Sequence, residues 1–216
     1  MVKCFMKVIL VNGSPHINGC TYAALEEVSK ALNSEGIETQ IFHVGETPLS
    51  GCTACKTCAK TGRCRFDDAV NEFMDLAKDA DGFVFGSPVH YAAASGAITS
   101  FMDRAFYSDM QSGRKYFCLK PAAAVVSARR AGTTSALDQL NKYFSISEMP
   151  IISSRYWNMV HGARPQDVKK DLEGMQTMRL LAKNMAWFLR CKEAGMKMGV
   201  PFPAREEKVY TNFIND

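Results

Sequence analysis

Four of the eight cysteines in this chain lie in one short segment, as Cys52, Cys55, Cys58 and Cys64. Spacings of two residues let successive sulfurs converge on one centre, where four thiolates complete either a cubane iron–sulfur cluster or a tetrahedral zinc site. Three closely spaced thiols in a row favour iron, since a zinc ribbon separates two pairs of cysteines by a longer stretch. The alternative is a loop that these residues merely shape, with no metal bound.

The spacing also differs from that of a bacterial ferredoxin. Five residues separate Cys58 from Cys64, and Arg65 rather than proline follows the last cysteine. The segment is therefore not a ferredoxin insertion. The remaining cysteines lack any such spacing, and we expect them to be small apolar packing residues: Cys4, Cys20, Cys118 and Cys191.

A second candidate site is the stretch NGSPHINGCT, residues 12–21, which follows an apolar run. It lacks the glycine–lysine pattern of a nucleotide triphosphatase and the GxGxxG pattern of a dinucleotide site. It offers Ser14, Asn18 and Thr21 as neutral donors, Gly13 and Gly19 as positions where the backbone can bend, and the positive end of a helix dipole. This combination suits a phosphate monoester. The alternative is an ordinary helix N-cap, in which serine and threonine are common.

Two later loops follow strand-like runs in the same way. GSPVHYAAASG, residues 86–96, places His90 and Tyr91 after a proline-restricted turn, where planar side chains can flank an aromatic ring. The alternative is that Tyr91 packs on the core while His90 faces solvent. SARRAGTT, residues 127–134, carries Arg129 and an adjacent arginine that can meet ring oxygens or a phosphate, or can simply be solvated.

The elements that must position these loops alternate between strand and helix along the chain. The continuous apolar run at residues 7–11 predicts a strand buried on both faces, and further strands are predicted at residues 39–44, 82–86, 121–127 and 149–153. Apolar residues at helical spacing predict helices at residues 21–35, 67–77, 98–105, 134–144 and 166–191. We therefore expect an α/β fold with a five-stranded parallel sheet and helices on both faces. Ligands of such sheets bind beyond the carboxyl ends of the strands.

Composition is consistent with one domain that can bury a sizeable core. The chain has 216 residues, of which 47% are hydrophobic and 22% charged. The absence of a secretory signal or an apolar run of roughly 18 residues leads us to expect a cytoplasmic protein with reduced thiols and no membrane partner. A net charge of +4, spread along the chain, implies no nucleic-acid partner.

The motifs GSPHINGCT and SPVHYAAASGAITSFMDR, in this order, resemble those of the flavodoxin-like NAD(P)H-dependent FMN reductases. The resemblance covers residue 7 to about residue 144. It implies that the first loop surrounds the FMN phosphate, through Ser14, His16, Asn18, Gly19, Cys20 and Thr21. It implies that the second loop lines the isoalloxazine, through Pro88, Val89, His90 and Tyr91. It implies that Ser127, Arg129 and Gly132 close the other side.

The cysteine spacing resembles that of the iron–sulfur flavoproteins, which are relatives of the same reductases. This resemblance implies that Cys52, Cys55, Cys58 and Cys64 ligate a [4Fe-4S] cluster near the flavin. The expected function is an FMN-binding oxidoreductase that passes electrons from NAD(P)H to a small-molecule or protein acceptor. The alternative is an iron–sulfur flavoprotein that carries electrons and is linked to ferredoxin. A non-catalytic carrier and a redox-sensing module remain open.

In either case the flavin does the chemistry, so we expect no catalytic side chain, with His90 the nearest candidate. The resemblance also implies a homodimer or homotetramer. We expect a flavodoxin-like FMN-binding domain over residues 1–198 and a C-terminal arm over residues 199–216. Beyond the fifth predicted strand, Arg155, Trp157 and His161 can approach a flavin or a neighbouring subunit; the alternative is that Trp157 fills a hydrophobic gap.

Overall fold

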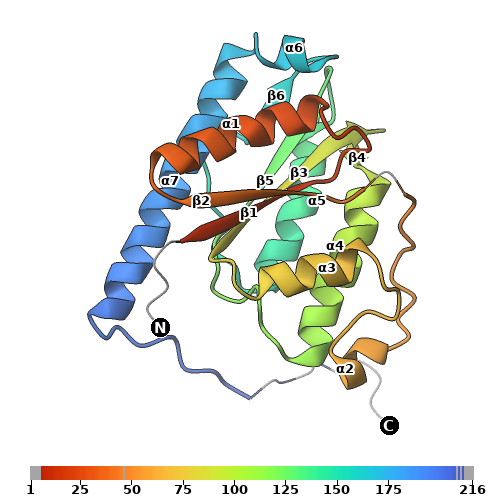
Figure 1. Cartoon of the computed structure of the whole chain (residues 1–216), viewed down its shortest axis with the longest axis vertical. Helices are drawn as coiled ribbons and strands as arrows, with labels where there is room; N and C mark the ends of the chain where they lie inside the picture. Colours follow the sequence, from red (N-terminus) through yellow and green to blue (C-terminus); the bar gives the residue numbers. More distant parts are fainter. Residues whose placement is uncertain (1–5, 46, 208, 210, 212–216) are drawn as a thin grey trace.

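The computed structural model describes residues 6–45, 47–207, 209 and 211, and it places a sheet between two layers of helices (Figure 1). The strands are β1 (Lys7–Asn12), β2 (Glu38–His43), β3 (Gly82–His90), β4 (Ala93–Ala94), β5 (Ala122–Ala128) and β6 (Met159–His161). The helices are α1 (Cys20–Ser34), α2 (Thr57–Thr61), α3 (Ala69–Ala77), α4 (Gly96–Ser112), α5 (Thr133–Ile146), α6 (Pro165–Val168) and α7 (Leu172–Lys197).

Five strands are parallel and stand in the order β2-β1-β3-β5-β6, while β4 pairs with the end of β3 in the antiparallel sense. The predicted α/β, flavodoxin-like fold with a parallel sheet is thereby confirmed. The chain runs outward to β2 in one direction and to β6 in the other, so the direction switches between β1 and β3. Ligands of open α/β sheets bind at such a switch point.

Successive residues of the central strands pack on opposite faces of the sheet, as the two-residue period of a strand requires. In β1, Ile9 and Val11 belong to the core shared with α3, α4 and α5. Val8 and Leu10 belong to the core shared with α1 and α7. Because both faces are covered, the strand reads as a continuous apolar run, which is why the sequence alone located it.

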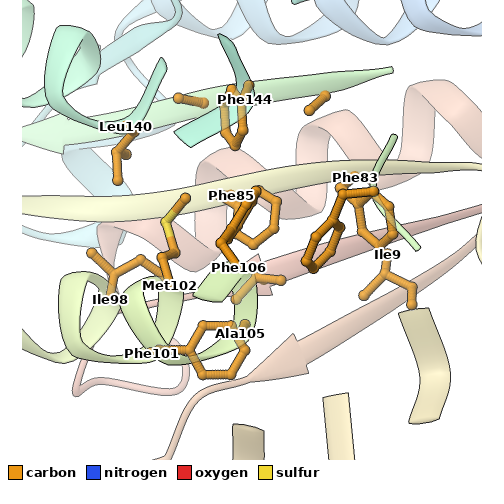
Figure 2. Packing of buried hydrophobic residues seen from close by; sticks show 14 of the residues in the cluster. Ile9, Phe83, Phe85, Ile98, Phe101, Met102, Ala105, Phe106, Leu140 and Phe144 are labelled. Atoms are coloured by element: carbon orange, nitrogen blue, oxygen red, sulfur yellow. The ribbon is translucent and has the colours of Figure 1, made fainter. Parts of the chain in front are cut away.

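The core on the α3–α4–α5 face is rich in phenylalanine (Figure 2). Phe85 of β3 lies 5.6 Å from Phe106 of α4 and 5.4 Å from Phe144 of α5, measured between ring centroids. Phe101 of α4 packs edge-on against Phe73 of α3 at 5.1 Å. These rings hold α4 firmly between its neighbours. Whatever side chains α4 presents at its two ends are therefore fixed relative to each other.

The fifth predicted strand, residues 149–153, is wrong in its main part. Only an isolated bridge joins Ile151 to Ala122, and the strand proper is β6, eight residues further on. The backbone pairs with the start of β5 near Ile151, loops outward, and returns to pair with the end of β5 through Met159. Both segments are apolar, so periodicity could not tell which would form the longer pairing.

Three smaller differences concern the loops and the last helix. The predicted helix at residues 166–191 is divided into α6 and α7, and the side chain of Asp171 caps α7 by accepting from the Gly174 amide at 2.9 Å. The sequence analysis missed α2 and the hairpin strand β4. Strand β3 also extends past its predicted end at residue 86 to His90. This extension carries the second loop away from the sheet.

From Gly199 onward, the described residues form no helix or strand. Arg205 pairs with Glu148, which lies in the turn after α5, so this part of the arm lies against the domain. The division at residue 198 between a domain and an arm stays a prediction.

Candidate functional site

Hydrogen bonds between backbone and hydroxyl groups tie the three predicted loops together at the carboxyl edge of the sheet. The Gly13 amide donates to Gly86 O at 2.9 Å, and the Ser95 hydroxyl donates to Gly13 O at 2.9 Å. Thr21 and Ser127 share a buried hydroxyl–hydroxyl bond of 2.8 Å. The first loop is thus fixed to both others, as the sequence analysis expected of a single site.

Inside the first loop, short side chains hold the backbone rather than cap the helix. The Ser14 amide donates to Asn12 Oδ1 at 3.2 Å, and the His16 amide donates to the Ser14 hydroxyl at 3.1 Å. The N-cap of α1 is Gly19, and no side chain accepts a hydrogen bond from the first turn. The interpretation of this loop as an ordinary serine or threonine N-cap is therefore wrong.

The uncapped start of α1 leaves donors available for a ligand. The first amides of a helix have no partner within the helix. In the described part of the chain, the structure gives no partner for the amides of Ile17 and Asn18 either. The other bonded amides of the loop are those of Ser14 and His16, described above, and those of Gly13 and Gly19, which donate to the carbonyl oxygens of Gly86 and His16. The loop thus combines amides that have no partner among the described residues with the positive end of a helix dipole, which suits a phosphate group.

The second loop is a tight hairpin between β3 and β4, with Tyr91 and Ala92 at its tip. Their φ angles are 49° and 60°, the left-handed conformation of a type I′ turn, which normally selects glycine or asparagine. The Tyr91 side chain is fully exposed. The alternative in which Tyr91 packs on the core is therefore wrong. His90 is exposed, while Pro88 and Val89 are half-buried.

The third loop packs directly against this hairpin. Gly132 has a φ of +91°, and a Cβ atom built on it would lie 2.6 Å from the Cα of Ala92. Only glycine allows that approach. Ser127 is buried, whereas Arg129 and its neighbour Arg130 are exposed. Both arginines are therefore accessible to a ligand from solvent.

These features fit FMN. The open amides beside α1 can bind a phosphate, the hydroxyl-linked loops are rigid, and an exposed planar side chain stands at the tip of a strained turn. Strained residues that persist in a well-packed structure often mark binding sites. The assignment of individual contacts to the predicted FMN-binding residues stays a prediction.

The four clustered cysteines line one pocket, together with Arg65, Phe66, Arg104, Tyr107 and others. Cys58 is buried at the start of α2, Cys64 is half-buried, and Cys52 and Cys55 are exposed on the preceding segment. In Figure 1 this segment (orange) leaves β2 and descends along α4 to reach α2. The four cysteines that the sequence spacing singled out therefore border the same pocket.

Arg104 of α4 is the centre of the hydrogen-bond network behind this pocket. Its side chain is only 1% exposed and forms a two-pronged ion pair with Asp68, at 2.8 Å for both bonds. Its Nε donates to the Cys64 sulfur at 3.3 Å. The remaining donors reach the carbonyl oxygens of Ser50, at 3.4 Å, and Phe66, at 3.2 Å.

Asn71 of α3 fixes the backbone of the fourth cysteine. Its Oδ1 accepts from the Cys64 amide at 2.9 Å, and its Nδ2 donates to the Cys64 carbonyl at 3.0 Å. Sequence analysis missed Arg104, Asp68 and Asn71. A signal was present for the first of them, because Arg104 falls among the apolar residues of the helical stripe containing Phe101 and Ala105. A charge in a buried stripe implies a buried partner.

The thiols themselves differ in their readiness to ionise. Hydrogen bonds from the side chain and backbone of Thr57 lower the pKa of Cys55 to about 7. Burial raises the pKa of the Cys58 thiol. Iron and zinc both bind the thiolate form, so the segment already contains one side chain close to the required state at neutral pH.

The pocket is narrow in this structure. Its volume is about 20 Å³, which is room for about one water molecule. Within residues 6–45 and 47–207, no three His, Cys, Asp or Glu side chains stand close enough to hold a single metal ion. The donor set fits a four-iron cluster, but the exposed part of the segment with Cys52 and Cys55 must move outward to admit it.

The remaining predicted residues lie around the β6 edge. Arg155 donates to Gln176 at 3.0 Å, and His161 ends β6 beside Ala128. Trp157 is 54% exposed and packs on Tyr156, so the interpretation that it fills a hydrophobic gap is wrong. Cys20 and Cys118 are half-buried, but Cys191 is exposed and its expected packing role is wrong. Cys4 lies outside the described residues.

Helix α4 connects the two candidate sites. Its N-cap residue, Ser95, holds the first loop through Gly13, while Arg104 faces the cysteine pocket. Nine residues at 1.5 Å each place the two positions about 14 Å apart along the helix axis. The sites are therefore separate but rigidly linked within one chain.

Among the described helices, none is long and apolar enough to span a membrane.

Comparison with known proteins agrees with this geometry. The family model described as NADPH-dependent FMN reductase matches residues 6–164. An iron–sulfur flavoprotein of Methanocaldococcus jannaschii is 32% identical over 190 residues, covering 84% of this chain and 96% of that protein. An iron–sulfur flavoprotein of Archaeoglobus fulgidus is 29% identical over 197 residues, covering 86% of this chain and 98% of that protein.

Similar solved structures share the fold at low sequence identity. The structure of RosB, with a bound 8-demethyl-8-formylriboflavin-5'-phosphate intermediate, has a TM-score of 0.68 at 14% identity, covering 98% of this chain and 94% of that one. A flavodoxin from the domain Archaea has a TM-score of 0.57 at 17% identity, covering 86% and 99%.

Proposed function

This chain belongs to the NADPH-dependent FMN reductase family, and we propose that it is an iron–sulfur flavoprotein that holds FMN and a [4Fe-4S] cluster. Family membership supports a flavin oxidoreductase with FMN as its cofactor. The observation that carries the finer proposal is the gathering of all four clustered cysteines around one pocket. Relatives that match most of the chain are themselves named iron–sulfur flavoproteins.

The proposed FMN site is the carboxyl edge of the sheet. The open amides of the first loop bind the phosphate, with Ser14 and Thr21 keeping that loop in place through their hydroxyl groups. The hairpin bearing Tyr91 borders the ring system on one side, and the loop with Arg129 borders it on the other. Bound FMN supplies the exchange between two-electron and one-electron transfers. The protein binds it, orients it and shields it from water.

The proposed cluster ligands are the four thiols of the pocket, Cys52, Cys55, Cys58 and Cys64. Two of them are already fixed: Cys58 by burial in α2, and Cys64 by Arg104 and Asn71. The exposed pair completes the set when the segment opens.

A second candidate function is a cluster-free, NADPH-dependent FMN reductase. A protein of Pseudomonas putida named FMN reductase (NADPH) is 29% identical over 99 residues, covering 45% of this chain and 46% of that protein. The narrow volume of the cysteine pocket also favours it. In that case NAD(P)H would be the electron donor, and the four cysteines would only shape a loop that binds no metal. With the cluster, a ferredoxin-like protein is the expected donor or acceptor.

The oligomeric state and the cellular location are part of the same proposal. We propose that the protein is a homodimer or a homotetramer, and the mass of the purified protein in solution tests this. A cytoplasmic location is consistent with a cysteine segment that needs reduced thiols.

The deciding experiment is anaerobic purification of the full chain, followed by measurement of FMN, iron and acid-labile sulfide for each polypeptide. The proposal expects one FMN together with four irons and four sulfides, the contents of one flavin and one cubane. If the protein contains FMN but no iron, even after anaerobic reconstitution with iron and sulfide, the cluster proposal is overturned and the cluster-free reductase is the function that remains. Absence of bound flavin at saturating FMN would overturn both functions.

A matched pair of variants sharpens the test. Cys64→Ser removes a proposed ligand, so iron should be lost while FMN is retained. Cys191→Ser removes an exposed thiol from α7 and should change neither. Equal iron contents in the two variants would contradict the assignment of Cys64. Rates of flavin reduction by NADH, NADPH and a reduced ferredoxin, measured on the same preparations, then identify the class of donor.

A further inference from the structure

Arg104 is an unusual residue to find inside the core of this domain. It is a guanidinium with 1% side-chain exposure on a helix whose neighbouring positions carry phenylalanine, methionine and alanine. Burial of a charge is costly unless it is paired and hydrogen-bonded. Removing it from water must therefore be offset by the contacts that it makes.

Those contacts use every donor that the side chain has. A guanidinium carries five N–H groups in a fixed planar arrangement. Two meet the carboxylate of Asp68, two meet the carbonyl oxygens of Ser50 and Phe66, and the fifth, on Nε, meets the sulfur of Cys64. The carbon at the centre of the group also lies 4.9 Å from the centre of the Phe66 ring.

The acceptors come from both sides of the cysteine segment. Ser50 precedes the first cysteine, Cys64 is the last one, and Phe66 and Asp68 follow it. One side chain of α4 therefore joins the two ends of the segment that carries the four thiols. The Ser50 end could not move away from α4 without breaking one of these bonds, and the other end could not do so without breaking four.

A purely structural clamp would not need to donate to the sulfur. Asp68 already balances the charge, and the two carbonyl groups already fix the chain. The Nε–H therefore stands out as a directed donor toward a proposed ligand atom. Hydrogen bonds to ligand sulfurs are among the factors that set the reduction potential of iron–sulfur clusters, because they withdraw electron density from the sulfur.

We propose that Arg104 is a positioning and tuning residue for the cluster, which holds the ends of the cysteine segment ready for assembly and raises the cluster's reduction potential through its bond to Cys64. This inference rests on the proposed function, since it needs a cluster on these thiols. Asp68 orients the guanidinium for this role. The ion pair is nearly neutral as a whole, so the effect comes from the directed N–H and not from a free positive charge.

The test compares Arg104→Lys with Arg63→Gln. Lysine keeps the charge beside Asp68 but has three donors from one nitrogen and cannot reproduce the planar contacts. Arg63 is in the same segment, next to Cys64, and pairs with Asp75 at the surface, at 2.8 Å. Its replacement changes the local charge but touches no thiol.

Both variants are reconstituted anaerobically and titrated electrochemically while the cluster is followed by electron paramagnetic resonance. Arg104→Lys should keep four irons, lower the cluster potential and speed the loss of iron to a chelator. Arg63→Gln should match the wild type in all three. A wild-type potential in Arg104→Lys would overturn the inference while leaving the cluster proposal intact. A wild-type protein that takes up no iron would overturn both.

A measurement on unaltered protein covers the case in which Arg104→Lys does not fold. Wild-type protein labelled with nitrogen-15 in its arginines should show a nitrogen coupling to the reduced cluster by electron–nuclear double resonance. The coupling should persist in Arg65→Lys, which removes the other arginine that lines the pocket. Absence of any coupling in the labelled wild type would overturn the inference.

Discussion

Replacement of Gly13 by alanine tests one of the two tightest glycine contacts in the candidate FMN site. A Cβ at this position would lie 2.6 Å from the Cβ of Ile98 and 2.8 Å from the carbonyl oxygen of Gly86. Ordinary contacts of a Cβ begin near 3.4 Å. Since Ile98 is fully buried and Gly86 belongs to the central strand β3, neither can retreat without disturbing the core.

The magnitude follows from what the methyl group displaces. Overpacking a well-filled core costs about 1–3 kcal/mol, and weakening the buried bond from the Gly13 amide to Gly86 adds about 1 kcal/mol. Gly13→Ala should therefore lower the free energy of unfolding by about 2–4 kcal/mol. For a domain of this size, that corresponds to a fall in Tm of about 4–16 °C.

The assay is thermal and urea unfolding of the FMN-free protein, with Gly96→Ala as the control. Gly96 begins α4, and a Cβ atom added there would meet no other atom within 4 Å. The control should stay within about 0.5 kcal/mol of the wild type. Equal stability of the two variants would refute the close approach of the first loop to β3.

Three further predictions concern the same fold and site. Thr21→Val leaves the buried hydroxyl of Ser127 without its partner and should cost about 1–3 kcal/mol in urea unfolding, more than Thr39→Val, whose bond is half-exposed. Burial raises the pKa of Asp109, so the stability that this group contributes is complete below its unfolded pKa of 3.8 and is lost as pH rises through the higher folded value. Asp109→Asn, which can still accept from the Tyr116 amide, should therefore unfold at a higher temperature than wild type at pH 7, with the difference vanishing toward pH 3; a constant difference would contradict this. FMN at one hundred times its Kd should stabilise the protein by about 2.7 kcal/mol, and riboflavin, which lacks the phosphate, should stabilise it less at the same concentration if the first loop binds the phosphate.

The order of the central elements could be predicted because the helices carry apolar residues on one face and the central strands are mostly apolar. The apolar run at residues 7–11 ends in a turn signal and is typical of a buried strand, and the apolar spacing at residues 21–35 is typical of a helix, as the structure has them. The edge of the sheet was harder. The segments around Ile151 and Met159 are both apolar, and which one pairs at length depends on where the intervening loop leaves the sheet. That choice is made by tertiary contacts, which the local pattern does not record.

The candidate site shows the same division. The cysteine spacing singled out four residues that line one pocket, and their role as cluster ligands stays a prediction. The hairpin at Tyr91 and Ala92 was missed, since its turn lacks the glycine or asparagine that usually signals one. The network around Arg104 was missed because its partners, such as Asp68 and the carbonyl group of Ser50, lie far from it in sequence.

The rigid link through α4 has a consequence for comparing sequences. One residue inserted between Ser95 and Arg104 would turn the arginine by about 100° around the helix axis and shift it by about 1.5 Å, away from Cys64. A chain that depends on both ends of this helix therefore tolerates substitutions there far better than changes of length. The number of residues between Ser95 and Arg104 can thus be used to select related sequences in which both ends of the helix make the same contacts, before any of their structures is known.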